Sequence, residues 1–421
     1  MTTFDTHSDL IAGRRVLNAP VSAMRIIGTA ALAFGVFLSG FVISEPAPYE
    51  LVIAGQVAVW FLIGLSLSRT VGILLALLIT FNVGGMLSLT QMVEDVGGGA
   101  IYIAVSVFLA LSAVFYAAMI EADHRRLKVM FQAWVIAAIL TSLLGIAGYF
   151  HLFPGAEVFT RYDRAKGAFQ DSNVFGPYLI APALYLLHGI LAQKLSTAPL
   201  RAAGLLVLTL GIFLSFSRAA WALFLFGAVM MVIIMLLKER SGAFRLKILL
   251  LSLAAAVLLV VAFVLALQSE QISNLLSSRT KLVQDYDGGH LGRFERHRIG
   301  FLMMMEKPLG IGPLVFSTIF PEDEHNVWLK SLTTYGWLGA VTYVGMVIST
   351  IVMGFNRLLR DRPWQPYLAI AWIVLCGHAL IGNVIDTEHW RHFYLLLGII
   401  WGCVALEYRH GRQTRAARAK H

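Results

Sequence analysis

The chain has 421 residues, of which 58% are hydrophobic and 14% are charged, and its formal net charge is +9. An average globular domain is about 45 to 50% apolar and about 25% charged, so the composition excludes an ordinary soluble domain. Two cysteines, Cys376 and Cys403, lie inside apolar runs, and their spacing indicates neither a disulfide framework nor a metal site. The composition predicts an all-α integral membrane protein.

Twelve apolar runs are each close to the roughly 20 residues that a helix needs to cross a bilayer. The first, 26–43, is longer than the apolar core of a signal peptide, which has about 7 to 15 residues, so we expect a retained first helix. The others lie at 51–68, 70–90, 98–120, 129–147, 173–192, 202–216, 219–237, 247–267, 333–354, 365–384 and 392–406. Because these runs are continuous rather than alternating, they predict about twelve transmembrane helices and not an outer-membrane barrel.

The stretch 202–237 is too long for one crossing, since a single helix over it would measure about 54 Å. Both of its flanks are basic, and this pattern favours two crossings with both outer ends of the stretch in the cytoplasm. We expect the break at Ser215-Phe216-Ser217-Arg218.

The charge distribution predicts a cytoplasmic N-terminus. With twelve spans in that orientation, 21 Lys and Arg and 7 Asp and Glu lie on the cytoplasmic side, leaving 12 and 17 outside. The excess of basic residues inside is typical of membrane proteins, so the net charge requires no nucleic acid partner. The basic connections are topology determinants first, with contact to anionic membrane lipids as a secondary possibility.

This topology divides the chain into five parts. We expect a cytoplasmic segment at 1–24, nine helices within 25–267, a periplasmic segment at 268–332, three helices within 333–406 and a basic cytoplasmic tail at 407–421.

The segment between the ninth and tenth spans has the periodicity of two surface helices, Ile272 to Val283 and Arg293 to Glu306, joined by a turn-rich connector at 285–292. Further along, Gly310 to Pro313 lacks the context of a nucleotide loop and is interpreted as a rigid turn.

Basic residues recur at three expected outer positions, where the other loops are acidic or short. They are Arg161, Arg164 and Lys166 before the sixth span, Arg218 at the break, and Arg293, Arg296 and His297 on one face of the second surface helix. Each group could bind an anion. The alternatives are that the first group pairs with neighbouring acids, that Arg218 extends to lipid headgroups, and that the third is a solvated face.

His325 and Asn326 follow a run of acids at the mouth of the tenth span. A neutral imidazole can accept a proton from a sugar hydroxyl near neutral pH, although a lone histidine at a helix start is more often structural. The acids Glu322, Asp323 and Glu324 either cap the helix N-terminus or hold a divalent cation, and capping is the favoured interpretation. Further polar residues that could line the same outer cavity are His378, Asn383, Asp386, Glu388, His389 and His392.

Four short segments together resemble the O-antigen ligase and polymerase superfamily of bacterial membrane glycosyltransferases. They occur in family order and with family-like spacing. The segments are GAFQDSNVFGPYL (167–179), SFSRAAW (215–221), GRFERHRIG with EKPLGIGPLVF (292–316) and EHNVWLKSLTTYGWLG (324–339). Ser172 departs from the family pattern, in which proline is often found, and His297 stands where an aromatic residue is usual.

The resemblance implies a GT-C-like fold in the bacterial inner membrane and transfer of a glycan from undecaprenyl pyrophosphate to an acceptor hydroxyl at the periplasmic face. The acceptor would be lipid A-core or a growing glycan. By motif position, Arg218 and Arg293 would engage the pyrophosphate and His325 would serve the acceptor. We expect substrate contacts from a further group: Arg161, Arg164, Lys166, Asn173, Arg296, His297 and Asn326.

The chemistry of the residues agrees with this function. Guanidinium groups meet phosphate oxygens in bidentate geometry, so arginines can stabilise a pyrophosphate leaving group without a metal. With no paired nucleophile visible, we expect a single inverting displacement, no cofactor and no metal. A ligase is slightly favoured, a polymerase of the same donor class is the alternative, and a flippase for lipid-linked sugars is the competing class.

Overall fold

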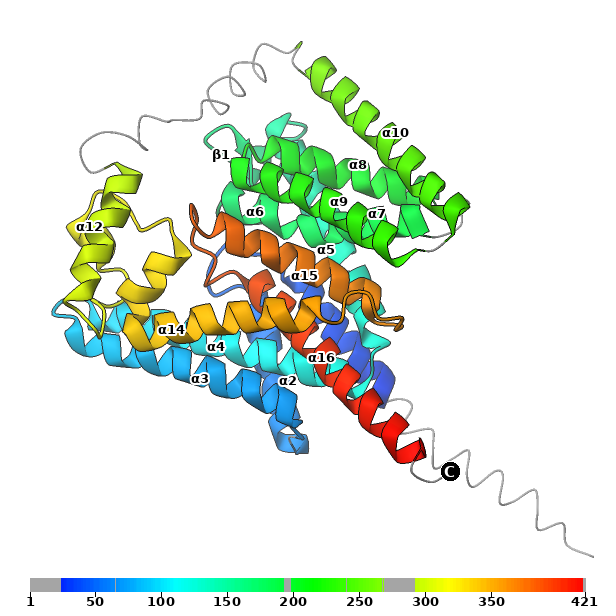
Figure 1. The fold of residues 1–421 in the computed structure, drawn as a ribbon. Coiled ribbons are helices and arrows are strands. Elements are labelled where there is room, and N and C mark those ends of the chain that lie inside the picture. The colour runs from blue at the N-terminus through cyan, green and yellow to red at the C-terminus, as the bar shows by residue number, and fades with distance from the viewer. Residues whose placement is uncertain are drawn as a thin grey trace, which may run out of the picture.

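The computed structural model describes residues 24–64, 66–192, 198–239, 241–266, 268 and 292–418. About three quarters of this part of the chain is helical (Figure 1). The longer helices are Met24–Leu38, α2 (Pro48–Ile63), α3 (Arg69–Ser88), α4 (Val96–Ala122), α5 (Arg126–Tyr149), α6 (Ser172–Tyr178), α7 (Ile180–Ala192), α8 (Ala198–Leu214), α9 (Arg218–Lys238), α10 (Gly242–Ala266), α12 (Arg293–Met305), α14 (Val327–Phe355), α15 (Gln365–Ile381) and α16 (Arg391–Arg418).

The short elements lie in the connections. They are η1 (Leu89–Gln91), η2 (Ala156–Phe159), β1 (Thr160–Arg161), β2 (Arg164–Ala165) and α13 (Phe316–Ile319). The two strands pair antiparallel across a two-residue turn, Tyr162-Asp163, in which both residues have positive φ. This is the turn geometry that best fits the twist of a hairpin.

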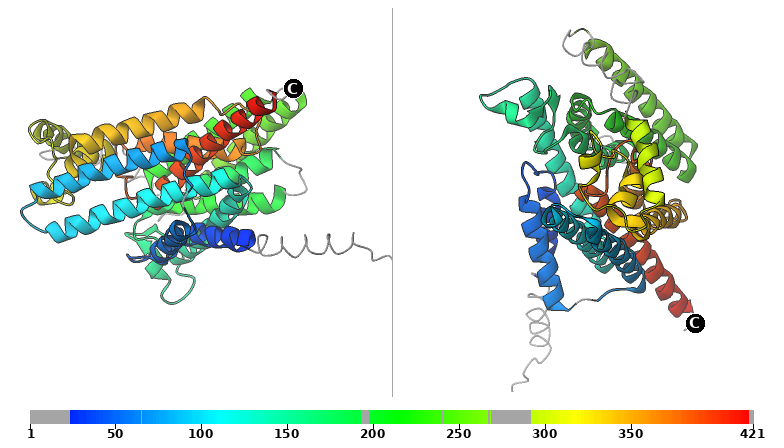
Figure 2. Two further views of the ribbon diagram at one scale, coloured as in Figure 1. Left: turned by 90° about the horizontal axis from the view of Figure 1, so that it is seen from below. Right: turned by 90° about the vertical axis from the view of Figure 1, so that its left-hand side faces the viewer.

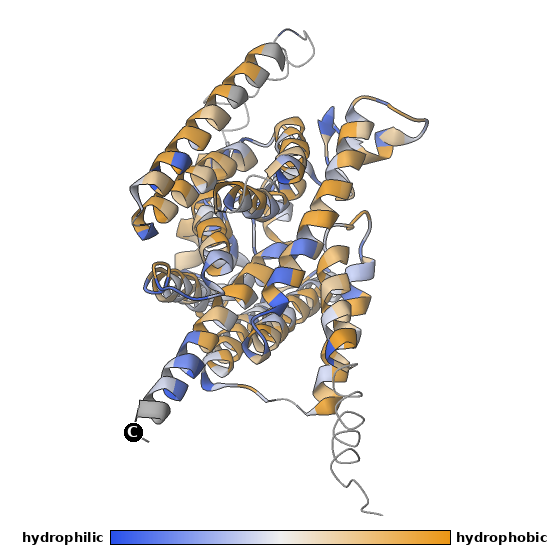
Figure 3. Cartoon of the chain, turned by 90° about the vertical axis from the view of Figure 1, so that its right-hand side faces the viewer, coloured by the Kyte–Doolittle hydropathy of each residue, from blue (hydrophilic) through white to orange (hydrophobic). Residues whose placement is uncertain are grey.

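Each of the twelve predicted spans coincides with helical structure. Among the described residues, six helical segments are long and apolar enough to cross a membrane, and four others are apolar but shorter. Their outward faces carry exposed apolar side chains such as Leu62, Leu225 and Val341, and hydrophobic residues dominate most helices in Figure 3. The fold is therefore that of an all-α, multi-pass membrane protein, whereas the number of twelve spans and the GT-C assignment stay predictions.

The predicted break between the seventh and eighth spans is confirmed. Helix α8 ends at Leu214 and α9 begins at Arg218. Ser217 caps α9 by accepting a hydrogen bond from the backbone N of Ala220, and Phe216 has a positive φ of 45°. A side-chain cap and a left-handed residue end one helix and start the next within three residues.

Helix α14 begins earlier than the predicted span and is interrupted at Gly336, whose φ of 63° is not helical. The interruption frees Thr333 O, which accepts hydrogen bonds from the backbone N of Ile311 and Gly312 at 2.8 and 3.1 Å, while Trp337 N donates to Pro308 O at 2.9 Å. The rigid turn predicted at Gly310 to Pro313 is thus observed, because it supplies the partners that the broken helix lacks.

The long helices form one bundle. Helix α3 lies between α4 and α14, α16 packs against α4 and α15, and α15 also contacts α9 and α7. The views in Figure 2 show α3, α4 and α14 side by side. One end of the bundle carries α12, here called the α12 end, and the C-terminal part of α16 projects from the opposite end (Figure 1).

Two predictions fall wholly or partly on residues that lie outside the described part of the chain. They are the surface helix at Ile272 to Val283 and the connector at 285–292, of which Gly292 is described. The second predicted surface helix, Arg293 to Glu306, is confirmed as α12.

Candidate functional site

The starts of α9 and α14 lie at the same level, at the α12 end. Helices α9 and α15 are antiparallel, because Lys238 at the end of α9 donates to Gln365 at the start of α15, at 2.9 Å. Leu223 of α9 packs on Gly377 of α15. Arg218 lies five residues before Leu223 at the start of α9, and Gly382 lies five residues after Gly377 at the end of α15. Both are therefore about 7.5 Å along the helix axis from this contact. Gly382 O in turn accepts from Val327 N at 2.8 Å.

Asn326 is the residue that caps α14. Its side-chain oxygen accepts from the backbone N of Trp328 and Leu329 at 3.0 and 3.1 Å. Its own backbone N donates to Asp386 Oδ1 at 2.8 Å, and its Nδ2 donates to Asn383 O at 3.3 Å. The expectation that the preceding acids cap this helix was wrong. The helix begins directly after Asn326, and an asparagine at that position satisfies the first backbone donors itself.

His325 precedes this cap in a left-handed conformation, with φ of 46°, and is half-buried. A positive φ in a residue other than glycine is uncommon and costs free energy unless the surroundings impose it. The hydrogen bonds of Asn326 to the 382–390 connector supply that constraint. These contacts hold the backbone of His325 beside the carboxylate of Asp386.

The predicted acids meet a lysine inside α14. Lys330 Nζ lies 3.3 Å from Asp386 Oδ2, 3.7 Å from Glu388 Oε1 and 3.8 Å from Glu324 Oε2. Thr333 donates to Glu324 Oε1 at 2.5 Å, and Tyr102 of α4 donates to Glu388 Oε1 at 2.7 Å. Three carboxylates thus surround a single buried ammonium, and the carboxyl groups outnumber the cation.

Burial changes the protonation of this carboxylate cluster, defined as Glu324, Asp386 and Glu388. Loss of solvent raises the pKa of Glu324 to about 7, against the opposing effect of Lys330. Burial also raises the pKa of Asp386, while the charges of Lys330 and His325 lower it. Near neutral pH, Glu324 is consequently able to take up or release a proton.

His389 closes one side of the carboxylate cluster. Its ring stacks on Tyr102 with centroids 3.9 Å apart, and its Nε2 lies 3.3 Å from Tyr335 Oη. Burial lowers the pKa of His389 to about 3, so the ring is neutral at physiological pH. Within the described ranges, no group of three or more His, Cys, Asp or Glu is arranged to hold a metal ion.

Helix α12 attaches to the acidic segment before α14. Arg296 is buried and pairs with Glu322, with Nη2 and Oε2 2.7 Å apart. His297 Nε2 lies 2.7 Å from Glu324 O, and since a carbonyl oxygen only accepts, Nε2 carries the proton. Burial lowers the pKa of His297, and the charges of Arg293 and Arg296 lower it further, so the ring is neutral near pH 7.

The helical face predicted from Arg293, Arg296 and His297 exists, and Arg296 and His297 contact the acidic segment before α14. Arg296 and His297 anchor the segment that carries His325, whereas Arg293 is the half-buried first residue of α12. Anion binding by this face stays a prediction.

One of the basic residues before the sixth span, Arg164, contacts the break that precedes α9. Arg164 is buried, and it donates from Nε to Ser215 O at 2.8 Å and from Nη2 to Asn173 Oδ1 at 2.7 Å. Arg161 is exposed and donates to Gln170 O at 3.3 Å, and Lys166 is half-buried. Arg164 and Asn173 are thus joined to each other and to the break that precedes Arg218.

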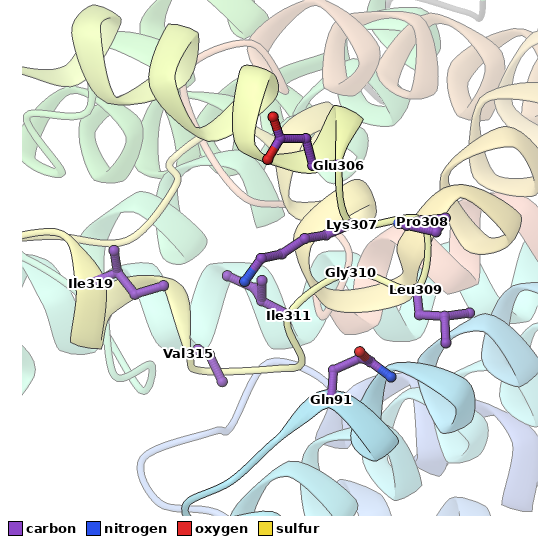
Figure 4. Close-up of a pocket in the computed structure, with 9 residues that line it drawn as sticks. All are labelled: Gln91, Glu306, Lys307, Pro308, Leu309, Gly310, Ile311, Val315 and Ile319. Carbon is purple, nitrogen blue, oxygen red and sulfur yellow. The ribbon is translucent and has the colours of Figure 1, made fainter.

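A cavity of about 280 Å³ lies beside the break in α14, at the α12 end. Figure 4 shows its lining, in which Glu306 and Lys307 are the charged side chains. The residues that line it are Gln91, Glu306, Lys307, Pro308, Leu309, Gly310, Ile311, Val315 and Ile319. They do not include Arg218, Arg293 or His325, so this cavity is separate from the three catalytic candidates.

Lys330 and Tyr102 were not predicted as site residues from the sequence. A lysine in an apolar helix is costly in the same way as the arginine at position 218. The apolar residues around Lys330 in WLKSLTTYG could therefore have marked it as a candidate site residue. Tyr102 carried none, because a tyrosine near the end of a transmembrane helix is common.

Comparison with known protein families identifies the central part of the chain. A family model described as O-antigen ligase matches residues 203–344. The match covers about a third of the chain and supports the resemblance to the O-antigen ligase superfamily. The O-antigen ligase segment begins in α8, ends in α14 and includes Arg218, Arg293 and His325. Asp386 and Glu388 lie beyond it. No curated protein matches the chain.

Proposed function

We propose that the protein is a glycosyltransferase of the O-antigen ligase type that moves a glycan from undecaprenyl pyrophosphate to a sugar hydroxyl on lipid A-core. The family match over the segment that contains Arg218, Arg293 and His325 carries this proposal. A GT-C-like bundle of twelve spans in the bacterial inner membrane, with the α12 end facing the periplasm, agrees with the distribution of basic residues along the chain.

Donor binding is assigned to Arg218 and Arg293, which begin α9 and α12 at the same end of the bundle. The pyrophosphate leaving group gains negative charge as the glycosidic bond breaks, and guanidinium groups that are already in position stabilise that charge. Arg164 and Asn173 support Arg218 by holding the break before it. Arg161 and Lys166 complete the expected donor contacts.

Acceptor activation is assigned to His325. Its imidazole takes the proton of the acceptor hydroxyl while that oxygen bonds to the anomeric carbon and the bond from carbon to the pyrophosphate oxygen breaks. The step inverts the anomeric carbon and releases undecaprenyl pyrophosphate. Asp386 lies close enough to His325 to interact with it electrostatically.

Asn326, Arg296 and His297 complete the proposed acceptor side. Asn326 fixes the backbone at His325, while Arg296 and His297 fix the acidic segment from α12. These three residues therefore set the position of the proposed base.

Deletion of the protein followed by gel analysis of surface glycan and of lipid-linked intermediates tests the function. Loss of a ligase leaves long polymer on the carrier lipid, because chain extension continues without transfer. Accumulation of single repeat units on the carrier would instead identify a polymerase. Lipid-linked glycan trapped on the cytoplasmic side would identify a flippase and contradict the proposal.

A further inference from the structure

A second cavity, of about 650 Å³, lies at the end of the bundle opposite to α12. It is formed by the connection between α14 and α15 and by the last turns of α16. The residues that line it are Arg357, Arg360, Arg362, Glu407, Tyr408, His410, Gly411, Arg412 and Thr414. None of them belongs to the proposed catalytic site.

The lining of this cavity is strongly basic. Four arginines face one glutamate, which leaves a net charge of +3 when His410 is neutral. The sequence beyond Thr414 adds Arg415, Arg418 and Lys420 and no acid. Asp361, between Arg360 and Arg362 in sequence, pairs with Lys238 at 3.5 Å. The lining of the cavity therefore keeps an excess of positive charge that suits an anion.

Two of the arginines are held in place by the glutamate. Glu407 is buried, and its carboxylate accepts from Arg360 Nη1 at 2.8 Å and from Arg362 Nε at 3.1 Å. Hydrogen bonds from both arginines outweigh the effect of burial and lower the pKa of Glu407. Glu407 consequently stays ionised and fixes the two guanidinium groups beside the cavity.

The other two arginines, Arg357 and Arg412, make fewer contacts with carboxylates of the protein. The guanidinium of Arg357 lies over the ring of Tyr408, 4.9 Å from its centroid, and donates to Met353 O at 2.7 Å. Stacking leaves the edge of a guanidinium group available to phosphate oxygens. Arg412 is exposed on α16 at the mouth of the cavity.

Exposed apolar side chains lie close to Arg357 and Arg360 in sequence, outside the lining of the cavity. Val352 and Phe355 of α14 and Leu359 of the connection are 52%, 63% and 56% exposed. A soluble anion gains nothing from this surface, whereas an acyl chain does. The combination fits a ligand with an anionic head and an apolar tail.

We propose that this cavity binds the phosphate headgroup of an anionic phospholipid, with the acyl chains in the apolar surroundings of the bundle. Basic pockets between transmembrane helices are suited to such headgroups. Ordinary topology determinants need only positive charge, whereas this site brings four guanidinium groups into one concave surface. The inference is independent of the proposed transferase activity.

The test uses the purified full chain in a non-ionic detergent and native mass spectrometry with added phosphatidylglycerol, cardiolipin or phosphatidylcholine. Each arginine near a headgroup contributes about fivefold in affinity, so Arg357→Gln combined with Arg412→Gln is expected to weaken anionic lipid binding about 25-fold. These two positions leave the Glu407 contacts of Arg360 and Arg362 in place.

Arg125→Gln combined with Arg409→Gln is the matched control. Both arginines are exposed at the same end of the bundle, outside the cavity, and the charge change is equal. We expect the control to bind anionic lipid as the unmodified chain does. An equal loss in both double variants would show that only general surface charge acts, and would overturn the proposal.

Gly411→Glu gives an independent test that removes no existing contact. No atom lies within 4 Å of a Cβ placed at Gly411, so a side chain fits there and would bring a carboxylate into the cavity. Anionic lipid binding should fall while elution and thermal unfolding stay unchanged. Unchanged binding in this variant, or equal binding of inorganic phosphate or pyrophosphate in place of lipid, would contradict a phospholipid site.

Discussion

Lys330 and Asp386 form an ion pair, 3.3 Å between Nζ and Oδ2, that joins the first turn of α14 to the connector before α16. Lys330 lies in the part of α14 that the family model matches, and Asp386 lies beyond the matched residues. The ammonium also lies within 4 Å of Glu324 and Glu388, so one side chain holds three acids together.

Replacement of Lys330 by methionine should strongly destabilise the protein. Removing one partner of a buried pair typically costs about 3 to 5 kcal/mol, because the opposite charge is left without compensation. Thermal unfolding in detergent measures the effect. Lys307→Met is the control, since Lys307 is exposed. Equal melting temperatures for the two variants would show that Lys330 is not required to hold the carboxylates.

The raised pKa of Glu324 predicts that the stability of the folded protein depends on pH. Its pKa rises from an ordinary value of 4.5 to about 7 on folding, so the folded protein binds this proton more tightly than the unfolded chain. The contribution is complete below about pH 4.5 and is lost as the pH rises to about 7. Glu324→Gln should remove this slope in unfolding measurements between pH 4.5 and 8, whereas Glu306→Gln, at an exposed position, should keep it.

Arg218→Lys and Arg293→Lys should each weaken binding of the lipid-linked donor by about tenfold or more. Lysine keeps the charge but loses the bidentate fork that matches pyrophosphate oxygens. Binding of undecaprenyl-pyrophosphate glycan to purified variants is the measurement. Arg298→Lys, on the exposed side of α12, serves as the control. Full donor binding and turnover in well-folded Arg218→Ala and Arg293→Ala proteins would exclude the assignment.

His325→Ala should lower turnover by about 10² to 10⁴-fold and leave donor binding nearly unchanged, as expected for a general base. His297→Ala separates two roles, because His297 is a second imidazole on this side of the site, and it bonds to Glu324 O. If His297→Ala lost turnover with donor binding intact while His325→Ala kept it, the base would be His297. Asn326→Ala should have a smaller effect on turnover than His325→Ala.

Turnover of the purified protein should be unaffected by EDTA. In the proposed mechanism, arginines provide the charge that a metal supplies in other phosphate chemistry. Release of glycosylated acceptor over time is the readout, with and without chelator. Activity that disappears with EDTA and returns with magnesium or manganese would assign a metal to the reaction.

The sequence by itself determined the helices and some of their boundaries. Hydropathy and helix signals operate over neighbouring residues, which is why the break before Arg218, the surface helix at Arg293 and the turn at Gly310 were predicted correctly. The motif segments likewise contained enough information to predict the family.

Only the tertiary structure decided which polar groups meet. Lys330 and Asp386 are 56 residues apart, and Arg296 and Glu322 are 26 apart, so no local pattern joins them. The acids before α14 resembled a helix cap, yet Asn326 caps the helix and releases Glu324 to bind Thr333 and Lys330. In a bundle of apolar helices, the packing of distant segments decides which group pairs with each buried charge. Hydropathy along the chain does not encode that packing.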